Sequence, residues 1–109
     1  MVDPPTWHLE VSSGMATLQF TGNLDTINGV NSAMALAEAL RASERVVIWD
    51  VHAMTGYDNG ARSAWQEQIQ PLRKRIREIR VVGATPITRF GTAALAIAIG
   101  VPAAFDKSE

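Results

Sequence analysis

The side chains best suited to acid–base chemistry lie near the middle of the chain. Asp50 and His52 are two residues apart at the end of an apolar segment, and Tyr57 and Asp58 follow. Because alternate residues of a strand point to the same face, Asp50 and His52 are expected side by side. A His, Asp and Tyr cluster can transfer protons, but group transfer also needs a nucleophile and an oxyanion site. The sequence offers no such combination, so we expect no enzyme active site.

Metal or thiol chemistry has little support in the sequence. The chain contains two histidines, His8 and His52, and no cysteine. The lack of cysteine excludes disulfides, thiolate chemistry and cysteine-ligated metals. The histidines have no third ligand at a matching spacing, and His8 is expected to point outward from an edge strand. We therefore expect neither a metal site nor a cofactor.

The composition is that of an ordinary globular domain. The chain has 109 residues, of which 47% are hydrophobic and 19% charged. This length suits one hydrophobic core, so we expect a single domain over residues 1–109. The net charge of −1 argues against a nucleic-acid partner. Most basic residues lie between Arg62 and Arg89, a run that we interpret as a solvated helix face.

Two further features bear on location. Residues 1–5 contain neither the basic nor the apolar region of a secretory signal. The longest apolar stretch, from Ala93 to Val101, is far shorter than the roughly 20 residues that a membrane span requires. We therefore expect a cytoplasmic protein with no transmembrane segment.

Alternating apolar residues predict a β-hairpin near the amino terminus. Apolar and polar residues alternate from Trp7 to Val11 and again from Ala16 to Phe20. The turn signal from Ser12 to Gly14 separates them, which favours an antiparallel pair. The segment from Thr21 to Asn23 is expected to end the second strand.

A helix and a central strand should follow the hairpin. Asp25 or Thr26 can cap the helix, which is expected to end near Ala42. Its predicted buried stripe consists of Ile27, Val30, Met34, Ala37 and Leu40. The next strand, from Arg45 to Val51, has a nearly continuous apolar centre, which is typical of a strand covered on both faces.

The second half of the chain repeats the alternation of helix and strand. The second helix should begin near Asp58 and be kinked or broken at Pro71. A buried strand is predicted from Ile79 to Val82, a third helix capped at Thr85 and ending at Ile99, and a last strand from Val101 to Phe105. The predicted apolar face of the second helix consists of Ala61, Trp65, Ile69, Leu72 and Ile76.

The predicted order of elements is β, β, α, β, α, β, α, β, an α/β fold. It indicates a mainly parallel mixed sheet with an antiparallel edge and helices packed against it. The chain resembles a STAS domain, and within that fold the small SpoIIAA-like group of bacterial anti-sigma factor antagonists. The most specific local match is Phe20 to Asp25. It resembles the family's strand-ending segment of an apolar residue, threonine or serine, glycine, a polar residue, leucine and aspartate.

The resemblance also locates a regulatory loop, from which this chain departs. The family's phosphoacceptor loop reads aspartate, serine, serine or threonine, glycine at the start of the second helix. Aligning its glycine with Gly60 puts Asn59 at the phosphoacceptor position and Asp58 before it. Asparagine has no hydroxyl to phosphorylate, and Thr55 and Ser63 are the nearest alternative acceptors. The resemblance therefore implies an anti-sigma antagonist platform without the usual kinase-controlled switch.

The expected function is to dock a protein partner without catalysis. The resemblance implies an anti-sigma-factor-like or other regulator as the partner. The binding surface should be centred on residues 54–60 and the start of the second helix, where α/β folds commonly bind ligands. The residues expected to contact the partner are Met54, Thr55, Tyr57, Asp58, Asn59, Gly60 and Arg62.

The third helix is apolar around nearly its whole circumference. No charged residue lies between Arg89 and Asp106. Such a helix is either buried on every side or presents one side to another molecule. One interpretation packs Leu95, Ile97 and Ile99 inward and leaves Arg89, Thr92, Ala93 and Ala96 in water.

Two other interpretations of this helix remain open. It can form a homodimer or partner interface, or it can bind a lipid or other apolar ligand. The second is suggested by the fold resemblance between the SpoIIAA-like group and the CRAL-TRIO lipid carriers. The residues assigned to such an interface or ligand site are Phe90, Ala94, Leu95 and Ile97.

Overall fold

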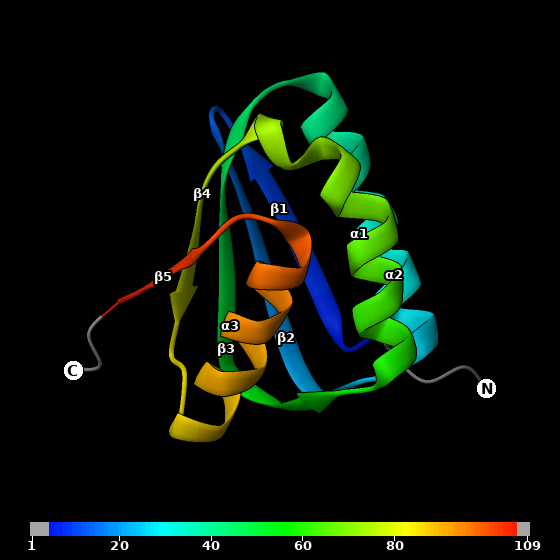
Figure 1. Cartoon of the computed structure of the whole chain (residues 1–109), viewed down its shortest axis with the longest axis vertical. Helices are drawn as coiled ribbons and strands as arrows, with labels where there is room; N and C mark the ends of the chain where they lie inside the picture. The colour runs from blue at the N-terminus through cyan, green and yellow to red at the C-terminus, as the bar shows by residue number, and fades with distance from the viewer. Residues whose placement is uncertain (1–4, 107–109) are drawn as a thin grey trace.

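The computed structural model describes residues 5–106 and contains the predicted succession of strands and helices (Figure 1). A short 3-10 helix, η1, is added between the second helix and the fourth strand. The elements are β1 (Trp7–Ser12), β2 (Met15–Leu24), α1 (Thr26–Ala42), β3 (Arg45–Tyr57), α2 (Asn59–Ile69), η1 (Gln70–Arg75), β4 (Ile76–Val82), α3 (Pro86–Ile99) and β5 (Ala103–Phe105).

The five strands form one sheet in the order β1-β2-β3-β4-β5. β1 pairs with β2 in antiparallel fashion, and every later neighbour is parallel. This confirms the predicted hairpin and the mixed sheet. Because each helix connects neighbouring strands in the same direction across the sheet, right-handed crossovers place α1, α2 and α3 on one face.

Coverage of only one face contradicts the prediction for the central strand. In β3, Val47, Trp49 and Val51 are buried beneath the helices. Ile48 and Asp50 alternate with them and are only partly buried. The expectation that this strand is covered on both faces was therefore wrong. Ile48 is apolar although it lies on the open face, and for this reason the apolar run in the sequence is not interrupted.

Aromatic side chains fill the centre of the core. The ring of Trp65, on α2, lies 5.5 Å from that of Trp49 and 6.1 Å from that of Phe20, both edge-on. Such offset geometry is the favoured arrangement of aromatic pairs. The indole nitrogen of Trp65 donates a hydrogen bond of 3.0 Å to the Ser32 hydroxyl on α1. This bond satisfies both buried polar groups and links the two helices across the core.

The strands β2 and β3 both extend beyond their predicted ends. The segment from Thr21 to Asn23 belongs to β2, and β3 continues past Val51 to Tyr57. Their pairing contains irregularities between Gln19 and Thr21 and between Gly22 and Asn23. At each irregularity β3 has one more residue than β2, as in a β-bulge. Glycine marks the second irregularity, so it does not terminate the strand as predicted.

Asp25 caps α1, as predicted, by accepting a hydrogen bond of 2.8 Å from the Asn28 backbone. The predicted stripe is correct only in its second half, where Ala37 and Leu40 are buried. Ile27 and Met34 are 71% and 53% exposed. The residues that α1 buries are instead Gly29, Ser32, Ala33, Leu36, Ala37 and Leu40.

The orientation of α1 follows from a close contact with α2. A Cβ atom added to Gly29 would overlap the backbone and side chain of Ala61. One added to Gly60 would overlap the side chain of Thr26. The small residues therefore allow the first turns of the two helices to touch. This contact turns the larger side chain of Ile27 outward.

Pro71 breaks the second helix, as predicted, because α2 ends at Ile69 and η1 follows. Ala61, Trp65 and Ile69 are buried as expected. Ile76 belongs to β4, which begins three residues before the predicted strand.

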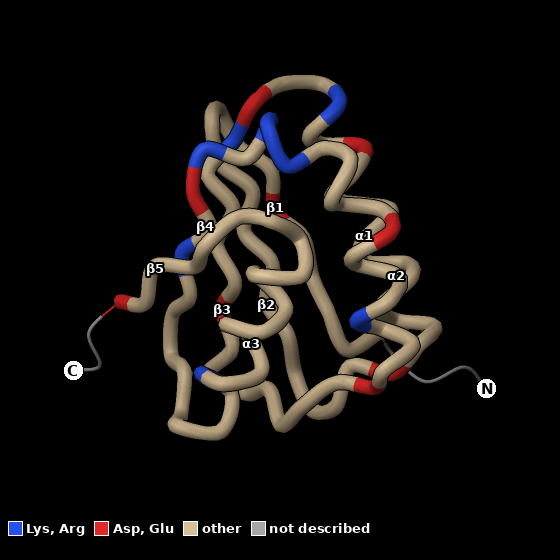
Figure 2. The backbone as a smooth tube through the Cα atoms, viewed as in Figure 1, with Lys and Arg blue, Asp and Glu red and all other residues tan. Residues whose placement is uncertain are grey.

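Basic residues gather at the η1 end of the molecule (Figure 2). Arg75 donates hydrogen bonds to the carbonyl oxygens of Leu40 (2.6 Å) and Arg41 (3.2 Å) near the end of α1. Arg45 donates to Ala39 on the same helix. The two Arg75 contacts satisfy carbonyl groups that the last turn of a helix leaves unpaired, whereas the Ala39 carbonyl also accepts the Ser43 N–H. Part of this cluster therefore stabilises the end of α1.

The third helix begins at Pro86 after the predicted cap at Thr85 and ends at Ile99, as predicted, with Gly100 as its C-cap. The Gly100 φ angle of 97° is left-handed, a conformation that favours glycine. The last strand, β5, is shorter than predicted and begins at Ala103.

Replacing Gly29 by alanine tests the contact between α1 and α2. At an unconstrained helical position this change stabilises by about 1 kcal/mol. Here the added methyl must displace Ala61, and we expect a destabilisation of about 1–3 kcal/mol. Chemical denaturation measures the difference. The control is Asn31→Ala, an exposed site on the same helix. A Gly29→Ala protein as stable as the wild type would show that the helices are not in close contact.

Candidate functional site

The predicted partner-binding surface lies where β3 ends and α2 begins. We call this junction, residues 54–62, the corner. Met54, Thr55 and Tyr57 belong to β3 rather than to a loop. The backbone N–H of Asp58 donates to the carbonyl of Leu24 at 2.9 Å. The ends of β2 and β3 are thus held side by side.

The Asp58 side chain does not cap α2, which corrects the prediction for this position. Its carboxylate instead accepts a hydrogen bond of 3.0 Å from the amide nitrogen of Asn23, on β2. The Asp58 backbone carbonyl still accepts the Arg62 N–H. The first amides of α2 therefore have no side-chain acceptor among residues 5–106.

The predicted contact residues differ in their accessibility. Thr55, Asp58, Asn59 and Arg62 are exposed, as is Ser63. Tyr57 and Gly60 are partly buried, and Met54 is buried. A partner can therefore reach most of this surface directly.

Tyr57 connects the corner to α3. Its phenol donates a hydrogen bond of 2.6 Å to the carbonyl of Gly91. A Cβ atom at position 91 would lie 3.2 Å from the Tyr57 ring, so glycine permits this approach. Burial raises the pKa of Tyr57 above its ordinary value of 10.0, although the positive charge of Arg62 opposes the shift.

The orientation of α3 differs from the predicted one. Leu95 and Ile99 pack inward as expected, but Ile97 is 74% exposed. Thr92 and Ala96, expected in water, are buried. The hydroxyl of Thr92 can be buried because it donates to the Thr88 carbonyl at 2.7 Å.

An apolar groove of about 200 Å³ separates α3 from the end of β3. It joins two regions that were predicted separately, the corner and the third helix. Its lining residues are Met54, Thr55, Gly56, Tyr57, Ile87, Thr88, Gly91 and Thr92. Ile87 was not predicted as a site residue, and it is 78% exposed. Its position one turn before Phe90 was the available sequence signal.

A second hollow of about 290 Å³ lies on the other side of α3. It is lined by Pro86, Arg89, Phe90, Ala93 and Phe105. Phe90 is 83% exposed and lies on the rim that faces solvent. The Arg89 guanidinium stacks 4.6 Å from the centre of the Phe105 ring, a cation–π contact. Of the four residues assigned to an apolar site on this helix, Phe90 and Ile97 are exposed, Ala94 is partly buried and Leu95 is buried.

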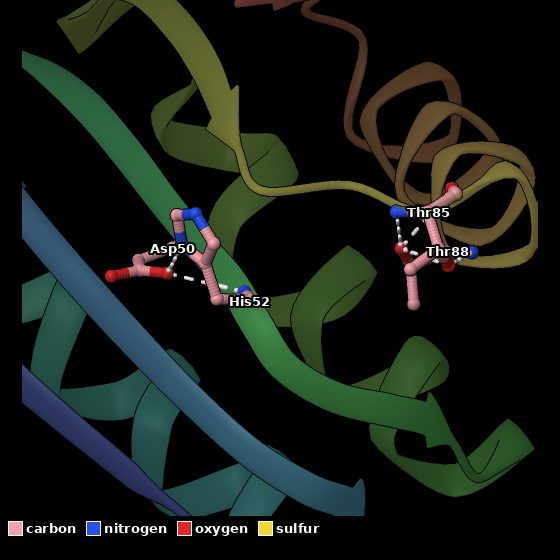
Figure 3. A network of polar contacts seen from close by, with 4 residues as sticks. All are labelled: Asp50, His52, Thr85 and Thr88. Atoms are coloured by element: carbon pink, nitrogen blue, oxygen red, sulfur yellow. Dashed lines mark hydrogen bonds and ion pairs between the residues drawn. The ribbon is translucent and has the colours of Figure 1, made fainter. Parts of the chain in front are cut away.

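The acid–base cluster is not assembled. Asp50 and His52 lie side by side as predicted, with 2.7 Å between the His52 Nδ1 and the Asp50 Oδ1 (Figure 3). The His52 ring also packs against Gly83. Asp50 lines a polar hollow on the open face of the sheet, whereas Tyr57 contacts α3 on the helical face. The sheet thus separates Tyr57 from this pair.

Both histidines lie on the open face of the sheet, but few other side chains that could coordinate a metal ion lie near them. His8 is exposed on β1 and lies 3.6 Å from Glu10. Within residues 5–106 no three His, Cys, Asp or Glu side chains come close enough to hold a metal ion. In the same part of the chain no helix has the length and apolar character needed to cross a membrane.

The paired threonines at the start of α3 belong to a helix cap. Thr85 accepts a hydrogen bond from the Thr88 backbone at 3.2 Å, and the Thr85 backbone donates to the Thr88 hydroxyl at 2.8 Å (Figure 3). This reciprocal pattern is a capping box. It fixes the first turn of α3, from which Ile87 and Thr88 line the groove.

Comparison with known proteins identifies the fold. No protein-family model and no curated protein sequence matches the chain. The solved structures include an uncharacterized DUF3478 protein from Shewanella loihica PV-4 with a SpoIIAA-like fold. It has a TM-score of 0.70 and 15% identity over 94% of this chain and 86% of that one.

A second similar structure is the anti-sigma factor antagonist SpoIIAA in its unphosphorylated form. Its TM-score is 0.65, with 15% identity over 94% of this chain and 89% of that one. The predicted STAS-like, SpoIIAA-like fold is therefore confirmed. At this identity the likeness concerns the fold alone.

Replacing Tyr57 by phenylalanine tests its contact with α3. Loss of the hydrogen bond to Gly91 should cost about 0.5–1.5 kcal/mol of stability at neutral pH. Because burial raises the folded-state pKa of Tyr57, its contribution is present below pH 10.0 and is lost as pH rises through the folded pKa. The stability difference between wild type and variant should therefore shrink at high pH.

Denaturation at neutral and alkaline pH measures this difference. Tyr57 is the only tyrosine, so ultraviolet absorbance reports its ionisation directly. A tyrosine that titrates in the folded protein as it does in the unfolded chain would contradict the burial of the phenol.

Proposed function

We propose that this protein is a non-enzymatic regulatory domain that docks a protein partner at the junction of β3, α2 and α3. The observation that carries the proposal is the apolar groove beside the exposed side chains of Asp58, Asn59 and Arg62. Interfaces commonly combine an apolar centre with a polar rim. The likeness in fold to an anti-sigma factor antagonist supports a regulatory partner of that kind. A cytoplasmic location is part of the proposal.

The chemistry of the surface suggests how a partner is held. The groove accepts an apolar side chain, and Ile87 extends its apolar wall. Asp58 and Asn59 present hydrogen-bonding groups at the rim, and Arg62 adds a positive charge. Tyr57 supplies a rigid aromatic wall because its hydroxyl is held by Gly91.

We further propose that this docking is not switched by phosphorylation at position 59. Asn59 is exposed at the first position of α2, but it carries an amide in place of a hydroxyl. Thr55 and Ser63 are exposed alternative acceptors. A phosphate on either would bring negative charge to the same surface.

The groove also supports an alternative function, the binding of a lipid or other apolar ligand. It and the second hollow flank the same helix, and the surface of both is formed mainly by apolar atoms. The exposed side chains of Ile87 and Phe90 extend this apolar surface. A second copy of the chain is another candidate to cover it.

Charge reversal and groove variants test partner docking. We expect Asp58→Lys and Ile87→Ser each to reduce capture of a specific partner at least about tenfold, because loss of a central contact costs about 1–2 kcal/mol or more. Affinity capture from the source cells with quantitative mass spectrometry measures the loss. The matched control is Ile27→Ser, since Ile27 is 71% exposed on α1 and outside the groove. Unchanged capture by both variants would refute the proposal.

Native mass spectrometry distinguishes the alternatives. If the groove binds an apolar ligand, the purified protein should carry a bound small molecule that organic extraction releases, and Ile87→Ser should reduce its occupancy. A homodimer would instead appear at twice the mass. A bare monomer for wild type and variant alike would leave partner docking as the supported function.

A further inference from the structure

The chain contains the dipeptide Asn-Gly twice, each time in the first turn of a helix. Asn28 and Gly29 lie in α1, and Asn59 and Gly60 lie in α2. Asparagine followed by glycine is the sequence most prone to spontaneous deamidation, because glycine has no side chain to shield its backbone nitrogen. The two sites share a sequence but differ in their contacts.

The first site is held by hydrogen bonds. The amide nitrogen of Asn28 donates to the Asp25 carboxylate at 3.0 Å, and its oxygen accepts the Thr6 N–H at 3.4 Å. The N–H of Gly29 donates to the Asp25 carbonyl at 2.8 Å. Both the side chain and the nitrogen that would attack it are therefore engaged.

The second site has none of these restraints. Asn59 is exposed, and no hydrogen bond to its side chain or to the Gly60 N–H occurs within residues 5–106. The side chain that would normally cap this turn, Asp58, is bound to Asn23 instead. Cyclisation at Asn59 therefore breaks no capping hydrogen bond of this turn.

Packing imposes the reactive glycine at this position. A Cβ atom at Gly60 would overlap the side chain of Thr26, so the contact between α1 and α2 excludes larger residues. The glycine that allows the helices to touch is therefore also the residue that follows Asn59 in the reactive dipeptide.

We propose that Asn59 is a spontaneous deamidation site that adds a negative charge to the proposed docking surface. The deprotonated backbone nitrogen of Gly60 attacks Cγ of Asn59, forming a nitrogen–carbon bond. The bond from Cγ to Nδ2 breaks, and the leaving nitrogen takes up a proton and departs as ammonia. Water then opens the cyclic imide to aspartate or isoaspartate, without oxidation or reduction.

The product changes the electrostatics of the corner. A carboxylate at the first position of α2 lies at the positive end of the helix dipole but also beside Asp58. It brings negative charge to the position where the resemblance expects a phosphate. The effect on partner binding rests on the proposed function, whereas the reaction itself does not.

The two sites can be followed separately in one sample. Trypsin cleavage after Arg41, Arg45 and Arg62 places Asn28 and Asn59 in different peptides. The folded protein is incubated at mildly alkaline pH, and fragmentation of the peptides by mass spectrometry locates each mass increase over time, because the Asn28 peptide also contains Asn23 and Asn31. We expect Asn59 to react at least about tenfold faster than Asn28, which must first break two hydrogen bonds to Asp25.

Two controls make the comparison decisive. In urea both sites should react at similar rates, because only folding distinguishes them. Asn59→Gln should abolish the change in its own peptide and leave the Asn28 peptide as in the wild type. Equal rates in the folded protein, or no reaction at Asn59 while the unfolded chain reacts, would overturn the proposal. These results need no partner, so they are independent of the docking experiments.

Discussion

The contact between the first turns of α1 and α2 determines how the corner of this protein is built. Gly29 faces Ala61, and Gly60 faces Thr26, with no space for a further carbon atom. The contact holds the amino termini of both helices beside the carboxyl ends of β2 and β3. It also explains why Ile27 lies in solvent although its spacing is that of a core residue. Small side chains thus decide the helix orientation more strongly than the apolar stripe does.

The irregular pairing of β3 with β2 has an equally large effect on the candidate site. In the regular part of β3, odd-numbered residues such as Val51 face the helices. The first extra residue shifts this alternation so that Met54 faces them, and the second restores it so that Tyr57 faces them again. Tyr57 can then donate to Gly91, which brings the strand end against α3 and leaves the groove between them. Without the first extra residue Met54 would lie on the open face of the sheet and could not line the groove.

The two faces of the sheet consequently differ in chemistry. The helical face carries the aromatic core and, at its edge, the apolar groove. The open face carries polar pairs such as Asp50 with His52, and Arg80 with Glu78. The groove is close to an exposed polar corner, an arrangement suited to recognition of a partner. The histidine pair is separated from Tyr57, so the arrangement that suggested proton transfer does not form.

Local sequence determined the elements, and tertiary structure determined their orientation. Neighbouring residues determine the alternation of apolar and polar side chains, the helix caps at Asp25 and Thr85, and the helix break at Pro71. The order of elements and the mixed sheet could therefore be predicted. The direction in which Ile97 points could not be predicted, because several faces of an apolar helix are equally suitable for burial. The groove likewise depends on residues far apart in the chain. The order of elements and the mixed sheet could therefore be derived from the sequence, whereas long-range packing settled how the corner is built and which apolar side chains remain exposed.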